Sequence, residues 1–202
     1  MKKSLMTLMA LLFLAFMSGT AQAVPLAIGG AEIPTGAASP GGTLITSLTT
    51  SFNGIFGQIA GTVTQNVLQN DTGMLFEYIV NSTGIGSITQ VTASFYGNFS
   101  TDVDGPIFPH TPHVDVITRG TDGQTVSWSY IDDAMLNGES SGTLWVQTNA
   151  AWYTQGGFSL IGADTATKVM YGPTNAVPEP ASMLLLGSGL AGMFAARRKK
   201  SL

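Results

Sequence analysis

The chain has 202 residues, of which 44% are hydrophobic and only 10% are charged. Twelve acidic residues outnumber eight basic ones, so the net charge is −4. There is no cysteine, which excludes disulfides, thiolate metal sites and cysteine nucleophiles.

Residues 1–23 have the pattern of a secretory signal peptide. Two lysines precede an apolar run from Leu5 to Met17, and Ala21 and Ala23 form an A-x-A cleavage site. The apolar run is too short to span a membrane comfortably. We therefore expect the chain to be exported and cut after Ala23. An uncleaved membrane anchor is the alternative.

The middle of the chain, residues 24–176, is much more acidic than the whole. It contains two basic and eleven acidic residues, a net charge of −9, and the other six basic residues lie in the two terminal segments. Without a basic patch this part has no means of holding a phosphate backbone, so nucleic-acid binding is excluded. Its length fits one domain that needs no disulfide.

Residues 24–51 are rich in Gly, Pro, Ser and Thr and poor in large apolar side chains. Such a composition predicts an irregular N-terminal arm. Leu44, Ile45 and Leu48 could add one strand to it.

Residues 52–176 alternate between apolar and polar side chains, which is the pattern of β-strands. Val126, Trp128 and Tyr130 share one face of a predicted strand over 124–130. Other runs of this kind lie at 59–65, 75–81, 88–95 (with Val91, Ala93 and Phe95 on one face), 114–118, 143–149, 158–161 and 168–171. Turn-forming residues separate them, so we predict an all-β domain, an antiparallel β-sandwich of about seven or eight strands. A single helical turn could form over 130–136.

Asp102 and Asp104 precede a glycine, as at the start of a calcium-binding loop. An EF-type loop would need a glutamate at its twelfth position, where this chain has His113. An irregular calcium site remains as one interpretation, and ordinary aspartate use in turns is the other.

His110 and His113 are the two histidines of the chain, and Asp115 follows closely. Imidazole pairs with a carboxylate can bind zinc or copper. Pro109 and Pro112 prevent the helix that would place both histidines on one face. The alternative is a stiff, exposed loop with solvated histidines.

Nothing in residues 24–176 predicts catalysis. There is no G-x-S-x-G nucleophile motif and no recognisable glycosidase carboxylate pair. We therefore expect a protein that is not an enzyme and needs no cofactor. Trp128, Trp145, Trp152 and Tyr153 could form a sugar-binding platform, but their positions favour core packing.

The C-terminal segment, residues 177–202, has three parts. Pro178, Glu179 and Pro180 form an extended tripeptide, because proline fixes φ and lacks an N–H. Residues 181–196 carry no charge and predict a short transmembrane helix. The basic cluster Arg197, Arg198, Lys199 and Lys200 then predicts a cytoplasmic end.

This tail resembles the PEP-CTERM sorting signal of Gram-negative bacteria. The resemblance implies that an exosortase, a membrane protease, recognises the tripeptide and removes the tail while the protein is anchored in the inner membrane. It also implies delivery to the cell surface or extracellular matrix in bacteria that make exopolysaccharide. An ordinary tail anchor with a Pro-Glu-Pro linker is the alternative.

Two functions follow as expectations. The first is an exported structural or interaction protein associated with exopolysaccharide or biofilm. The second is a ligand-binding β-sandwich module for polysaccharide or calcium.

Overall fold

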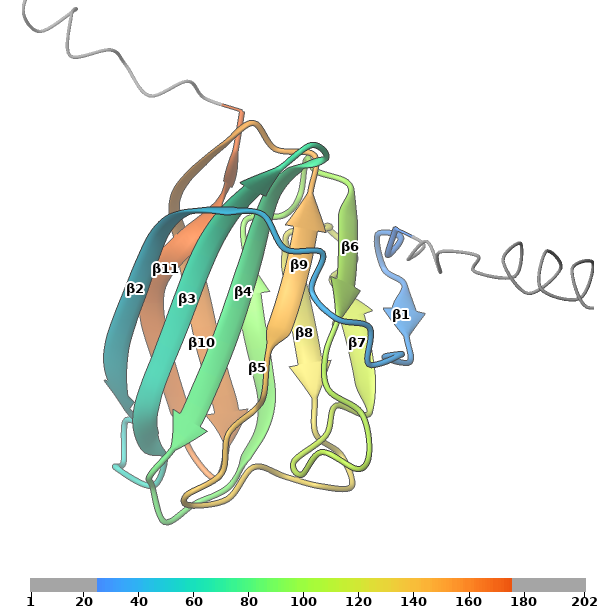
Figure 1. Ribbon diagram of the computed structural model, residues 1–202. Helices are drawn as coiled ribbons and strands as arrows, with labels where there is room; N and C mark the ends of the chain where they lie inside the picture. Colours follow the sequence, from blue (N-terminus) through green and yellow to red (C-terminus); the bar gives the residue numbers. More distant parts are fainter. Residues whose placement is uncertain (1–24, 176–202) are drawn as a thin grey trace, which may run out of the picture.

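The computed structural model describes residues 25–175, which form eleven β-strands and no helix (Figure 1). The strands are β1 (Ala31–Glu32), β2 (Thr43–Asn53), β3 (Ala60–Asn70), β4 (Gly73–Ser82), β5 (Ile88–Ser94), β6 (Thr101–Asp104), β7 (Val116–Arg119), β8 (Thr125–Ser129), β9 (Leu144–Thr148), β10 (Trp152–Gly162) and β11 (Thr165–Thr174). All neighbours pair antiparallel.

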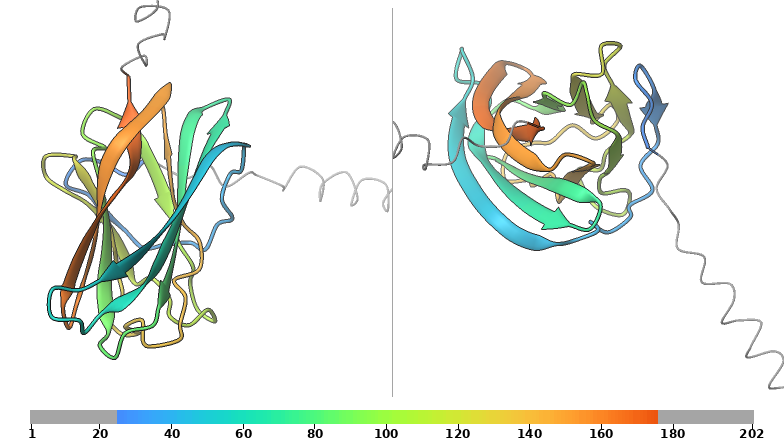
Figure 2. Two further views of the ribbon diagram at one scale, coloured as in Figure 1. Left: turned by 90° about the vertical axis from the view of Figure 1, so that its left-hand side faces the viewer. Right: turned by 90° about the horizontal axis from the view of Figure 1, so that it is seen from above.

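The strands form two sheets that pack against each other like the layers of a β-sandwich (Figure 2). The six-stranded sheet has the order β1-β7-β8-β5-β10-β11, and the five-stranded sheet has the order β2-β3-β4-β9-β6. The edge strands β2 and β11 contact each other, so the two layers meet along that side. The all-β prediction is confirmed, but the structure has more strands than predicted.

The core lies between the sheets and follows the predicted alternation. Tyr78 on β4 is buried, as are Val126 and Trp128 on β8. The Tyr78 ring stacks on Phe158 with centroids 5.0 Å apart, and its hydroxyl is 2.8 Å from that of Tyr96. Burial raises the pKa of both tyrosines above the ordinary value, so these hydroxyls stay protonated.

Phe95 departs from the predicted pattern. Strand β5 ends at Ser94, and Phe95 adopts a positive φ of 83°, a conformation that side chains rarely take. The backbone therefore turns, Phe95 is 53% exposed, and Tyr96 enters the core in its place. The predicted face of Val91, Ala93 and Phe95 is correct for its first two members and wrong for the third.

Two further expectations have different outcomes. The strand that Leu44, Ile45 and Leu48 could add is confirmed as β2, so the second half of the predicted irregular arm is not irregular. Within the described residues 130–136 there is no helical turn. Met135 instead pairs with Ile88 as an isolated β-bridge.

One amide side chain joins the two sheets at the β11 edge. Gln65, fully buried on β3, donates from Nε2 to the Tyr171 carbonyl at 2.7 Å. Its Oε1 accepts from the Tyr171 N–H, also at 2.7 Å. The backbone groups of one edge residue are thus satisfied across the sandwich, and they are not available to another strand.

Arg119, at the end of β7, forms hydrogen bonds with several loops. It is 5% exposed, and its guanidinium donates to the carbonyls of Leu26, Tyr96, Phe99 and Gly123 at 2.7–3.3 Å. These four acceptors come from the N-terminal segment, the loop after β5 and the β7–β8 turn. The planar guanidinium with five donors suits this task, whereas a point charge does not.

We predict that Arg119→Met destabilises the protein by about 3 kcal/mol or more, because buried carbonyls lose their donors. Arg119→Lys should give a smaller loss of the same sign. Urea denaturation of the purified protein followed by tryptophan fluorescence measures both. Lys168→Met, at an edge strand, should stay within about 0.5 kcal/mol of the wild type. Equal effects at the two positions would contradict the assignment.

Asp164 organises the loop between β2 and β3 from the β10–β11 turn. It is 5% exposed, and its carboxylate accepts the N–H groups of Phe56, Gln58 and Thr165 at 2.7–3.2 Å. Burial acts to raise the pKa of Asp164, but the backbone hydrogen bonds lower it by more, so the net shift is downward.

This shift predicts an acid-sensitive contribution to stability. The folded pKa lies below the unfolded value of about 3.9, so the contribution is complete above about pH 4 and is lost as the pH falls through the folded pKa. Asp164→Asn should therefore lower the urea midpoint at pH 7 and flatten its decline below pH 4. Asp71→Asn, in an exposed turn, serves as the control. An equal loss for Asp164→Asn at pH 7 and pH 3 would contradict the prediction.

Candidate functional site

The predicted sorting and cleavage residues lie outside the described part of the chain. This holds for Ala21 and Ala23 at one end and for Pro178, Glu179 and Pro180 at the other. It also holds for the basic cluster Arg197, Arg198, Lys199 and Lys200. The last described strand, β11, ends at Thr174.

Residues 35–41 form a strap that crosses the outer side of β9 and β6 on the way from β1 to β2 (Figure 1). Asp104 on β6 fixes this strap. Its carboxylate accepts the N–H groups of Thr35, Gly36 and Ala37 at 2.8–3.2 Å and the Thr35 hydroxyl at 2.5 Å. The N–H of Gly105 also donates to it, at 2.7 Å. With these donors the carboxylate is saturated and has little capacity left for a cation.

The strap is tied at two further points. Trp145 donates from Nε1 to the Ala37 carbonyl at 3.1 Å. Asn70 donates from Nδ2 to the Gly41 carbonyl at 3.0 Å. The strap therefore covers Trp145, which is 2% exposed although it lies on the outward side of β9.

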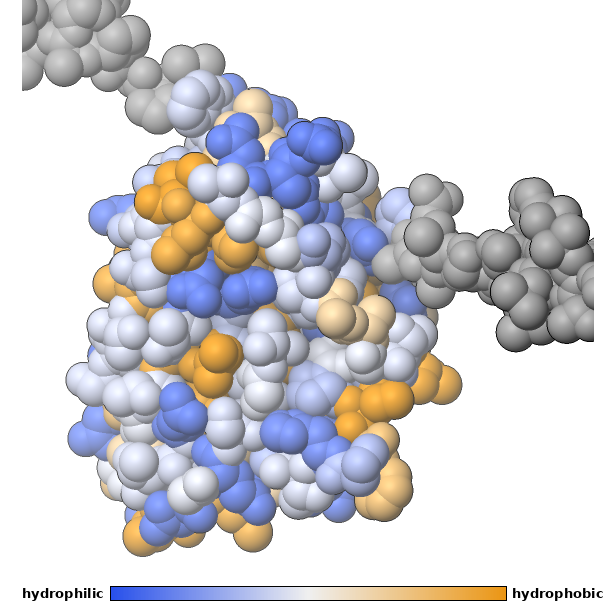
Figure 3. Space-filling model, viewed as in Figure 1, coloured by the Kyte–Doolittle hydropathy of each residue, from blue (hydrophilic) through white to orange (hydrophobic). Residues whose placement is uncertain are grey.

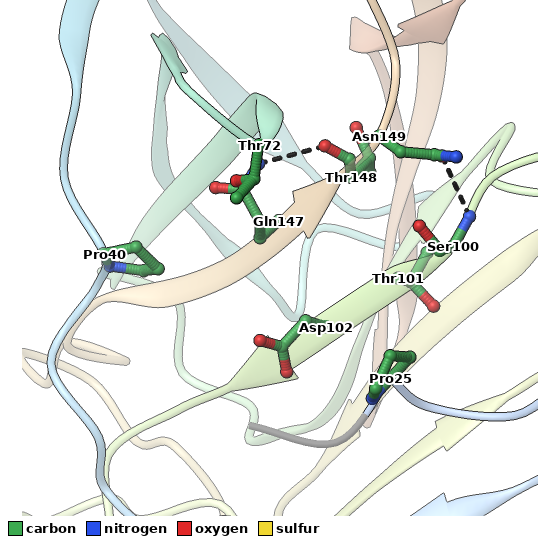
Figure 4. A pocket seen from close by; sticks show the side chains of 9 residues that line it. All are labelled: Pro25, Pro40, Thr72, Ser100, Thr101, Asp102, Gln147, Thr148 and Asn149. Atoms are coloured by element: carbon green, nitrogen blue, oxygen red, sulfur yellow. Dashed lines mark hydrogen bonds between the residues drawn. The ribbon is translucent and has the colours of Figure 1, made fainter. Parts of the chain in front are cut away.

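A pocket of about 270 Å³ opens beside the strap (Figure 4). It is lined by Pro25, Pro40, Thr72, Ser100, Thr101, Asp102, Gln147, Thr148 and Asn149. Most of its polar groups are satisfied within the chain: Asn149 accepts from the Ser100 N–H at 3.0 Å, and Gln147 donates to the Thr148 carbonyl at 3.0 Å. Asp102 is the exception, because its Oδ1 is buried and has no hydrogen-bond partner.

The two histidines of the β6–β7 loop do not converge. His113 lies between two carboxylates, with Nδ1 3.2 Å from Asp133 and Nε2 3.5 Å from Asp115. His110 points elsewhere, and its Nε2 is 3.3 Å from the Ser140 carbonyl. Asp115 in turn accepts the N–H groups of Ile131 and Asp132. These side chains hold a loop together through hydrogen bonds.

The structure therefore does not bring the predicted metal ligands into one site. Within residues 25–175 no group of three or more His, Asp or Glu side chains could hold a metal ion. The physical reason differs for each member. Asp104 is saturated by the strap, His110 and His113 diverge, Asp115 caps a bend, and Asp102 faces the pocket.

The sugar-binding platform, the less favoured interpretation of the four aromatic residues, does not form, because some of these side chains are buried and others are exposed. Trp128 is fully buried and Trp145 is 2% exposed, whereas Trp152 is 40% exposed. Tyr153 is half-buried and packs edge-on against Tyr171. The interpretation as core residues is correct for Trp128. Trp145 is buried beneath the strap on the outer side of the sheet, and Trp152 is largely exposed.

The outer faces of both sheets are rich in hydroxyl groups. On the five-stranded sheet, which faces the viewer in Figure 3, the Thr49 and Thr64 hydroxyls are 2.9 Å apart. On the six-stranded sheet, one row of cross-strand partners consists of Thr118, Ser127, Thr92, Ser159 and Thr167. Ser127 is buried, and its hydroxyl is 2.8 Å from that of Thr92. The accessible hydroxyls of the row, which carry no charge, are therefore those of Thr118, Thr92, Ser159 and Thr167.

Comparison with known proteins identifies the tail. The PEP-CTERM protein-sorting motif matches residues 176–199. The chain carries a PEP-CTERM protein-sorting motif. The motif confirms the resemblance drawn from the Pro-Glu-Pro tripeptide, and it supports export and sorting by an exosortase. No curated protein and no solved structure matches the chain.

Residues 25–175 contain no helix that is long and apolar enough to cross a membrane.

The roles of Arg119 and Asp104 were not predicted from the sequence. The sequence offered one indication for Arg119, since it is one of only two basic residues in the range 24–176. No local pattern marks Asp104 as an acceptor for the distant strap.

We predict that Asp104→Asn loosens the strap, because the amide side chain offers one acceptor oxygen in place of two. Amide hydrogen exchange at Thr35, Gly36 and Ala37 should become about tenfold faster, in line with the loss of a charge-assisted hydrogen bond. Exchange in the β3 and β4 core should stay unchanged. Asp71→Asn is the matched control, and comparable exchange in both variants would contradict the role of Asp104.

Proposed function

We propose that this chain is an exported structural or interaction protein that an exosortase sorts to the cell surface or extracellular matrix. The observation that carries the proposal is the sorting motif at residues 176–199. The motif begins two residues after β11 ends at Thr174, so the β domain is complete before the sorting signal starts. Removal of the tail would leave every described strand intact.

Each part of the tail has a role in this proposal. Pro178, Glu179 and Pro180 would be the segment that the protease binds, since neither proline can join a helix or central strand. Residues 181–196 hold the chain in the inner membrane until it is cut. Arg197 to Lys200 keep the end of the tail in the cytoplasm.

The β domain would act through its surface, without catalysis. Its outer faces carry accessible hydroxyl groups, such as those of Thr49 and Thr64 on one sheet and of Thr118 and Thr92 on the other. Its net charge is strongly negative, so it would repel anionic polymers and favour a neutral, hydroxyl-rich one. Association with exopolysaccharide in a biofilm matrix is the setting that these features support.

The processing step makes a direct prediction. Glu179→Ala should leave nearly all of the protein at full tail length in the inner membrane, whereas the wild type should lose the tail and leave that fraction. Intact mass of the protein from each cell fraction of the native host measures both. The wild-type mass should correspond to a chain whose last residue lies near Pro180.

Asp71→Ala removes an acidic side chain from an exposed turn and is the control for this variant. It should be processed like the wild type. Normal release of Glu179→Ala would contradict recognition of the motif. If the mass of the wild type shows that the chain still ends at Leu202, the tail is an ordinary membrane anchor.

A further inference from the structure

The pocket beside the strap contains a carboxylate that lacks a counter-charge. Asp102 lines this pocket, and its Oδ1 is buried without a hydrogen-bond partner. Burial raises the pKa of Asp102; the Val103 N–H partly offsets this, and the nearby Asp104 adds to it. Glu32 on β1 lies in the same negative field, and its pKa is also raised by burial and by both aspartates. An unpaired carboxylate in such a position favours a cationic partner.

The described part of the chain does not supply this partner. Its basic side chains are Arg119 and Lys168. Arg119 donates to four backbone carbonyls, and Lys168 lies on β11, at the far edge of the other sheet. Any cation that reaches Asp102 must therefore come from outside residues 25–175.

The N-terminal segment enters the fold at this pocket. Leu26 is 5% exposed, and its N–H donates to the Thr101 carbonyl at 2.6 Å, next to Asp102. Its own carbonyl accepts from Arg119 at 3.0 Å. Pro25 lines the pocket together with Asp102, and Figure 4 shows the two side by side. The position of Pro25 is thus set by the bonds of the residue that follows it.

Cleavage after Ala23 would create a cation next to Pro25. Val24 is bonded directly to Pro25, and Pro25 lines the pocket. In the uncut chain the nitrogen of Val24 is a neutral amide. After the cut it becomes an α-ammonium, with a positive charge and three N–H donors.

We propose that this pocket is a binding site for a primary ammonium group, and that its ligand is the α-ammonium of Val24, which pairs with Asp102 after the signal peptide is removed. The inference goes beyond sorting, and it rests on export and on the predicted cut after Ala23. It gives signal-peptide removal a structural consequence: the cut supplies the one charge that the pocket lacks. A terminus shifted by one residue would carry its charge about 3.8 Å away and lose the pair.

The test uses the processed protein with its tail, purified in detergent from a mutant host that lacks the exosortase. Three further forms are compared with the wild type: Asp102→Asn, an insertion of one alanine between Ala23 and Val24, and the control Asp71→Asn. Intact mass identifies the first residue of each form. The rate at which the terminal amine is acylated, followed across pH, gives the pKa of the α-ammonium.

In the wild type the α-ammonium should titrate above its usual range of about 7.7–8.0, because Asp102, with Glu32 and Asp104 nearby, stabilises the charged form. At pH 8 the wild type should therefore react about threefold more slowly than Asp102→Asn. The insertion form keeps Asp102 and should react as fast as Asp102→Asn. Asp71→Asn should match the wild type.

Two results would overturn the proposal. Equal acylation rates in the wild type and in the insertion form would show that Val24 does not pair with Asp102, and this comparison remains valid even if Asp102→Asn fails to fold. A first residue other than Val24 would show that the required terminus is not made. Neither result bears on the C-terminal tail, which the separate mass measurement on Glu179→Ala tests.

Discussion

The fold depends on one buried guanidinium that has carbonyl partners instead of a carboxylate. Arg119 accounts for four backbone acceptors that no strand pairing satisfies. Two of them, Tyr96 and Phe99, belong to the loop that follows the positive φ at Phe95. The turn that sends Tyr96 into the core is therefore stabilised by the same side chain that holds Leu26. A buried charge is tolerated here because its donors are occupied by backbone dipoles.

Carboxylates also hold loops in place, but they accept hydrogen bonds from backbone N–H groups, whereas Arg119 donates to carbonyls. Asp104 holds the strap, Asp164 holds the β2–β3 loop, and Asp115 holds the bend at Ile131. In each case a carboxylate accepts backbone N–H groups from another loop, 16 to 108 residues away in the sequence. These three aspartates therefore have a structural role that needs no ligand. This explains why aspartates and histidines that looked like metal ligands are engaged elsewhere.

The strands were predictable where the side chains that face the core are apolar and those that face outward are polar. The alternation of Val126, Trp128 and Tyr130 follows directly from a half-buried strand. Strand β2 was predicted only as a possible strand at Leu44, Ile45 and Leu48, because as an edge strand it is mostly exposed and shows no clear apolar face. The fate of Asp104 was not predictable either, since its donors lie almost seventy residues away. Local pattern identifies a strand, but it does not reveal which distant loop a carboxylate will hold.

The two predicted cuts lie close to the physical limits of the domain. At the start, Leu26 is already fixed by Thr101 and Arg119. At the end, Thr174 still pairs with Trp152 across the β10–β11 hairpin. The basic residues outside these limits, six of the eight in the chain, belong to the two segments that signal-peptide cleavage and sorting would remove. Processing at both ends would therefore leave an acidic domain with its one buried arginine and one edge lysine. Its association at the surface would have to rely on uncharged hydroxyl rows, because nearly all of the positive charge would be gone.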